Sequence, residues 1–147
     1  MDKTSITVTA LISAPVEKVW DYWTDPKHIV SWNNASDDWH SPRAENDLRP
    51  GGKFLARMEA KDGSYGFDFE GIYDEVKPLQ RIVYTLGDGR EVRILFEKAG
   101  SGSKVTETFE AEQTNSAELQ QQGWQAILDN FKNYVEVSTA AETMHPK

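Results

Sequence analysis

The chain has 147 residues, of which 38% are hydrophobic and 27% are charged, a composition that fits one domain with a sizeable core. It contains no cysteine, which excludes a disulfide framework, a thiol nucleophile and a thiolate metal site. The formal net charge of -8 argues against a nucleic-acid partner, because a phosphate backbone attracts lysine and arginine side chains.

The N-terminal segment, residues 1–15, lacks the basic and apolar regions of a signal peptide. No apolar run approaches the ~20 residues that a membrane-spanning helix needs. We therefore expect a cytoplasmic protein that is not inserted in a membrane.

The first predicted element is a strand over residues 4–13, in which apolar and polar residues alternate. Pro15 then opens a helix whose apolar residues recur at helical spacing, and Asp25-Pro26 predicts an N-cap and first-turn proline for a second short helix, 26–32. Residues 38–112 change to strand patterns and tight turns, with Asp-Gly pairs at the hairpins. The predicted strands there are 38–41, 53–60, 65–76, 81–86, 91–98 and 104–112.

A long amphipathic helix of about 20 residues closes the chain, capped by Asn115 or Ser116. Its large apolar residues lie on one side, and include Trp124, Ile127 and Phe131. An antiparallel sheet of seven strands curls because strands twist, and its concave face needs a cover. The order therefore predicts an α+β helix-grip fold: a curved seven-stranded antiparallel sheet wrapped around the C-terminal helix, with two short helices after the first strand. We expect one domain over residues 1–138 and a C-terminal tail over 139–147.

Five segments in this order carry a resemblance to a known superfamily: APVEKVWDYWTDPKHIVSW (14–32), RPGGKF (49–54), DGSYGFDFEGIYDEVKP (62–78), RIVYTL (81–86) and GWQAILDNFKNYV (123–135). The chain resembles the START-like, or SRPBCC, superfamily, whose fold is also called helix-grip or birch-pollen-allergen-like. More narrowly, it is similar to the family named after the C-terminal domain of the heat-shock-protein-90 ATPase activator.

The resemblance implies a cavity between the sheet and the C-terminal helix, which members of the superfamily use for lipids, sterols, polyketides and plant hormones. Carried over by position, the residues that line it are Trp32, Trp39, Phe54, Met58, Phe67, Phe69, Tyr73, Tyr84, Trp124, Ile127, Leu128 and Phe131. Pockets of this kind are mainly apolar and aromatic. The alternative is that these side chains meet and fill the space as an ordinary core.

Glu107 is the candidate for catalysis, because it shares a strand face with Val105 and Phe109, which point inward. A buried carboxyl is costly unless it is paired, and burial raises its pKa. Asp68 and Glu70 alternate with Phe67 and Phe69, so we expect them to face water unless a bulge at Gly71 changes the alternation.

No nucleophile elbow, phosphate loop or dinucleotide fingerprint is found in the sequence, and we expect no cofactor. His40 lies near acidic residues, Asp37, Asp38, Glu45 and Asp47, but their spacing matches no zinc pattern, so we expect no metal.

We therefore expect binding of a small, mainly apolar molecule such as a lipid or polyketide, rather than catalysis. One alternative is a cyclase- or hydratase-like enzyme that uses the same cavity, since holding a reactive chain in a shaped pocket needs no strong motif. The other is a chaperone-related protein-interaction module. The activator carries an additional N-terminal domain, whereas this chain begins at the first predicted strand, which makes a chaperone partner the less favoured reading. The sequence leaves the oligomeric state open.

Overall fold

The computed structural model describes residues 5–33, 38–112 and 116–144, with side chains up to residue 139. Strands and helices follow one another in the predicted order, which confirms the α+β helix-grip class. The elements are β1 (Ser5–Ile12), α1 (Val16–Thr24), α2 (Pro26–Trp32), β2 (Trp39–Asn46), β3 (Lys53–Ala60), β4 (Gly66–Lys77), β5 (Arg81–Leu86), β6 (Glu91–Ala99), β7 (Gly102–Glu110) and α3 (Ala117–Met144).

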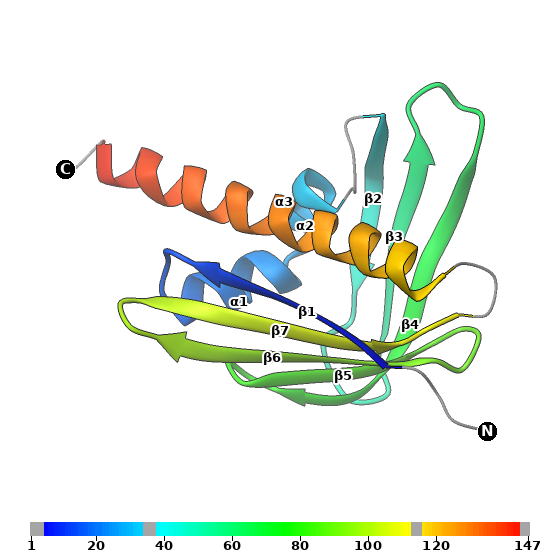
Figure 1. Ribbon diagram of the computed structural model, residues 1–147, viewed down its shortest axis with the longest axis horizontal. Coiled ribbons are helices and arrows are strands. Elements are labelled where there is room, and N and C mark those ends of the chain that lie inside the picture. The colour runs from blue at the N-terminus through cyan, green and yellow to red at the C-terminus, as the bar shows by residue number, and fades with distance from the viewer. Residues whose placement is uncertain (1–4, 34–37, 113–115, 145–147) are drawn as a thin grey trace.

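The seven strands form one antiparallel sheet in the order β1-β7-β6-β5-β4-β3-β2. Figure 1 shows that β1, β5, β6 and β7 run side by side, whereas β2, β3 and β4 stand crosswise to them, so that the sheet curls. The helix α3 lies across the concave side, and α1 and α2 fill the gap beside it. This arrangement confirms the predicted grip of the sheet on the C-terminal helix.

The densest core lies between the β1–β7–β6 part of the sheet and the second half of α3. The burial of β1 alternates strictly, so Val8 and Ile12 face the core while their neighbours face outward, as predicted. From α3, Leu128, Phe131 and Val135 are fully buried against this part of the sheet and α1. Several kilocalories per mole follow from burying side chains of this size.

Local signals in the sequence position the two short helices. The Asp25 side chain accepts a hydrogen bond from the Lys27 N–H at 2.9 Å, and Pro26 is the first residue of α2, which confirms the predicted cap. Pro15 is in an extended conformation and immediately precedes α1 at its N-cap position. The two helices are then bound to α3, because Tyr22 and His28 hydrogen-bond Ser138 and Tyr134 at 2.7 and 2.8 Å.

The structure differs from the prediction in the length of some elements. β2 runs to Asn46 instead of ending near residue 41, and α3 has 28 residues instead of about 20. The Ser116 hydroxyl accepts the Leu119 N–H at 3.1 Å and caps α3, whereas Asn115 lies outside the described residues. The proposed boundary at residue 138 stays a prediction.

Two further differences concern side chains and register. The register shift in β4 lies between Tyr73 and Glu75 rather than at Gly71. Gln120, expected on the polar side of the helix, is buried, and its side chain bonds both the backbone N–H and the carbonyl of Glu112. A polar residue is buried here because the chain between β7 and α3 offers it backbone partners.

No helix in the described residues is long and apolar enough to cross a membrane.

Candidate ligand-binding site

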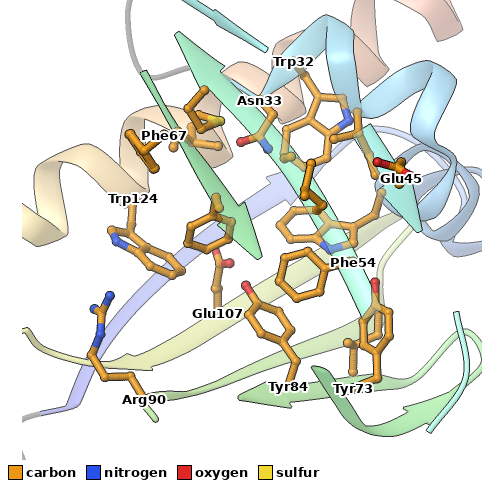
Figure 2. A pocket seen from close by; sticks show the side chains of 18 of the residues that line it. Trp32, Asn33, Glu45, Phe54, Phe67, Tyr73, Tyr84, Arg90, Glu107 and Trp124 are labelled. Atoms are coloured by element: carbon orange, nitrogen blue, oxygen red, sulfur yellow. The ribbon is translucent and has the colours of Figure 1, made fainter. Parts of the chain in front are cut away.

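A cavity of about 290 Å³ lies between the β2–β5 part of the sheet and the helices α2 and α3. Figure 2 shows it from close by, with Trp32 and Trp124 at its two ends and Phe54, Tyr73 and Tyr84 along the sheet wall. For comparison, an apolar cavity of roughly 150 Å³ admits benzene. The space therefore suits a molecule of about two rings or a short chain.

Nine of the twelve residues predicted to line such a cavity do line it. Two come from α3, one from α2, and the rest from neighbouring strands of the sheet: Trp32, Phe54, Met58, Phe67, Phe69, Tyr73, Tyr84, Trp124 and Ile127. Phe67 stands at the margin, since it is 38% exposed. Seven of these nine side chains are aromatic, which gives flat faces for stacking.

The three remaining residues lie elsewhere. Leu128 and Phe131 are fully buried in the core one turn further along α3, where Phe131 packs edge-on against Trp32 and Trp23 at ring distances of 4.8 and 4.9 Å. Trp39 belongs to a separate aromatic group with Tyr65 and Phe67 near the β3–β4 hairpin. Leu128 and Phe131 thus belong to the packed core, which was the alternative to a cavity, and Trp39 is not part of the cavity wall.

Several residues line the cavity that were not expected there from the sequence. The apolar ones come from helices and strands, and the polar ones come mostly from loops or strand ends. They are Trp23, Ile29, Asn33, Glu45, Leu55, Ala56, Ile82, Arg90 and Glu112. The alternation of β3 contained a signal for Ala56, because a small residue between Phe54 and Met58 on one face leaves space.

The hydrogen bonds of Tyr73 explain how the sheet wall is held. Its hydroxyl donates to the Asn46 side chain at 2.6 Å, and the Asn46 amide donates to the Thr24 carbonyl at 2.6 Å. Burial raises the pKa of Tyr73 well above its ordinary value, so the hydroxyl stays protonated as a donor. Gly71, two residues before Tyr73 on β4, leaves room for the Phe54 ring, since a Cβ at Gly71 would lie 2.9 Å from that ring.

Glu107 is a buried carboxyl in the cavity wall. It is 6% exposed, lines the cavity from β7, and points into it beside Tyr84 in Figure 2. Burial raises its pKa from 4.5 to about 8, and within the described residues no hydrogen bond or cation offsets that effect. The inward orientation expected for Glu107 is therefore found, and the carboxyl is protonated at neutral pH.

Other charged groups lie at the rim. Arg90 is held by Asp88 at 2.8 Å and donates to the Glu110 carbonyl at 3.3 Å. Asp68 and Glu70 face outward, where they pair with Arg57 and Lys53 at 3.2 and 3.3 Å. Asp68 and Glu70 are therefore not part of the cavity wall, whose charged or titratable residues besides Glu107 and the tyrosines are Glu45, Arg90 and Glu112.

The histidine considered for metal binding is a surface residue. His40 lies 3.7 Å from Glu59, and both side chains are partly exposed, while Asp37 lies outside the described residues. Across residues 5–33, 38–112 and 116–139, no three His, Asp or Glu side chains come together in a way that would hold a metal ion.

A family model and solved structures that are similar to this chain point to the same family. A family model described as activator of Hsp90 ATPase homolog 1-like protein matches residues 13–136. The solution structure of an AHSA1-like protein from Aeromonas hydrophila is 44% identical, with a TM-score of 0.89 over 98% of this chain and 100% of that one. No curated protein matches the chain significantly.

Two further solved structures are similar. A protein from Cytophaga hutchinsonii is 50% identical, with a TM-score of 0.76 over 99% of this chain and 96% of that one. A protein from Chromobacterium violaceum is 25% identical, with a TM-score of 0.81 over 90% of this chain and 98% of that one. The similarity extends over nearly the full length of each of these chains.

Proposed function

Because the chain belongs to the family of activator of Hsp90 ATPase homolog 1-like proteins, we propose that it binds a small, mainly apolar molecule between the sheet and α3. The observation that carries this proposal is the cavity of about 290 Å³ with its aromatic wall. Sites for small molecules are typically concave, apolar and supplied with a few polar groups. Proteins with this fold commonly bind hydrophobic ligands, which supports the same proposal.

The unfilled space also favours this proposal over a protein-interaction role. A chaperone-related module needs no internal cavity, and a filled core between the sheet and α3 would have favoured it. Here the first half of α3 faces the cavity through Trp124 and Ile127, and the second half faces the core. The helix face that the fold leaves partly uncovered is thus directed inward rather than toward a partner.

The test uses N-phenyl-1-naphthylamine, an uncharged probe that fluoresces when it leaves water. We expect saturable one-to-one binding to the wild-type protein. Ala56→Leu adds a side chain to the cavity wall and should weaken binding at least tenfold. Ala117→Leu is the matched control, since it makes the same change at an exposed position in the first turn of α3. Absence of saturable binding in the wild type, or equal binding by Ala56→Leu, would contradict the proposal.

A second candidate function is favoured by Glu107. A carboxyl that is protonated near neutral pH, and that lies within a ligand cavity, has the properties of a general acid or base. A cyclase- or hydratase-like reaction would then use the same cavity. The discriminating result is turnover of a bound compound that depends on pH and disappears in Glu107→Gln.

A further inference from the structure

Two polar side chains reach the same part of the cavity from alternate strands. In the sheet, Ile94 of β6 pairs with Ile82 on one side and with Glu107 on the other, and Val92 pairs with Tyr84 in the same way. Glu107 on β7 and Tyr84 on β5 therefore share the concave face, with β6 between their strands and an offset of one inward position along them. Figure 2 shows the Tyr84 hydroxyl and the Glu107 carboxyl directed to the same region of the cavity.

The surroundings of Glu107 determine whether its carboxyl is protonated or ionised. Its neighbours in the adjacent strands are Val8 and Ile94, and α3 contributes Trp124 and Ile127 to the cavity wall, so these elements present no charge to it. The other titratable groups that line the cavity are Tyr73, Tyr84, Glu45, Arg90 and Glu112. Of these, Tyr84 is the group whose pKa the charge of Glu107 raises, after the larger effect of burial.

Both groups are donors at neutral pH. Burial holds the Glu107 carboxyl in its protonated form and keeps the Tyr84 hydroxyl far from ionisation. An apolar site that keeps a carboxylic acid protonated next to a tyrosine hydroxyl can direct two hydrogen bonds at one oxygen atom. A ligand oxygen between them would accept both hydrogen bonds in a mainly apolar site, where such bonds are stronger than in water.

We propose that Glu107 and Tyr84 form a two-donor site for an uncharged carbonyl oxygen, so that the ligand is an apolar ketone or ester. This inference rests on the proposed binding function and narrows it. A carboxylate ligand is disfavoured because Arg90, the cation at the rim, is already engaged by Asp88. An ammonium ligand is disfavoured because it would lose its hydration in a mainly apolar cavity, and such a desolvation penalty often exceeds the gain from the ion pair.

The test compares two probes of the same shape, 2-acetylnaphthalene and 2-isopropenylnaphthalene, by isothermal titration calorimetry. They differ in a carbonyl oxygen that the second replaces by a methylene group. At about pH 6.5 we expect the ketone to bind the wild-type protein about tenfold more tightly. As the pH rises through about 8 the ketone should lose this advantage, because ionised Glu107 no longer donates, while the affinity of the alkene for the two-ring cavity falls much less.

Variants separate the two donors. Glu107→Gln keeps a donor at every pH, so we expect it to retain the preference for the ketone and to abolish its dependence on pH. Tyr84→Phe removes one donor and should weaken ketone binding severalfold without changing alkene binding. If Glu107→Gln does not fold, as judged by circular dichroism, Tyr84→Phe and the wild-type pH series still decide the question.

The outcomes are distinct. Equal one-to-one binding of ketone and alkene at all pH values would overturn the two-donor site and leave the binding function intact. Tighter binding of 2-naphthylmethylamine than of the ketone would also overturn it, in favour of a cation site. Failure of every probe to bind would contradict the proposed function as well.

Discussion

At the residue scale, the protonation of Glu107 links stability to pH. The folded chain raises its pKa from 4.5 to about 8, so the folded state binds the proton more tightly than the unfolded state. The stability contributed by this proton is full below about pH 4.5 and is lost as the pH rises toward about 8. At about 1.4 kcal/mol per pKa unit, the loss is roughly 3–5 kcal/mol.

We therefore predict that the free energy of unfolding of the wild type falls between about pH 5 and about pH 8.5 relative to that of Glu107→Gln. Urea unfolding across this range measures the difference. Glu97→Gln, the same change at an exposed position on β6, should keep the wild-type profile. Parallel profiles for wild type and Glu107→Gln would show that Glu107 is not buried as described.

Two phenylalanines of the helix-grip core allow a second prediction. Phe131 is fully buried and contacts Trp23 and Trp32, so Phe131→Ala should cost about 3–5 kcal/mol. Phe69 is half-buried at the cavity, and Phe69→Ala should cost less than half of that because fewer contacts are lost. Denaturant unfolding of the two variants checks the ratio, and equal costs would indicate a filled cavity.

At the element scale, Asn46 joins three elements. Its side chain accepts from Tyr73 on β4 and donates to Thr24 at the end of α1, while its backbone belongs to β2. Replacing it leaves the buried Tyr73 hydroxyl and the Thr24 carbonyl without these partners, so Asn46→Ala should cost about 1–3 kcal/mol. In the Asn46→Ala background, Tyr73→Phe should then be nearly neutral. A full additive penalty in this double-mutant cycle would mean that the two side chains act independently.

The helices and strands also show how much of the structure could be predicted from the sequence. Sequence patterns located every strand and helix, because strands with one buried face and helices with one buried side leave a clear periodicity. The weakest case is β2, which was expected over 38–41 and runs to Asn46. Periodicity also placed Trp124, Ile127, Leu128 and Phe131 on one side of α3, but it gave no information about what lies opposite each turn. The first two face a cavity and the last two face the core, a distinction that depends on how the sheet curls.

Polar lining residues were harder to predict for a related reason. Glu107 could be identified because its alternation with apolar neighbours contradicts its charge. Arg90 and Glu112 lie just outside strands, where no periodic pattern applies, and they reach the cavity through the curvature of the sheet. The pairing of Glu107 with Tyr84 required the strand order, since β6 separates them.

At the scale of the whole molecule, binding should be measurable as stability. A ligand that binds the folded state alone adds about 2.7 kcal/mol to the free energy of unfolding at one hundred times its dissociation constant. We predict this gain for the wild type with 2-acetylnaphthalene, and little gain for Ala56→Leu at the same concentration. Thermal or urea unfolding with and without the probe measures it. An equal gain in both proteins would place the binding site outside the cavity.

The division of α3 between core and cavity has a consequence for how such a chain can diverge. The contacts that determine folding are concentrated on β1, β6, β7 and the second half of the helix, whereas much of the cavity wall comes from β3, β4 and the first half. Substitutions at Phe67 or Phe69 can therefore alter the shape of the cavity at small cost to stability, while substitutions at Phe109 or Val135 cannot. In a library of variants selected for abundance alone, the first pair of positions should accept many residue types and the second pair few. New ligand preferences can therefore arise in this fold through substitutions that leave the protein folded.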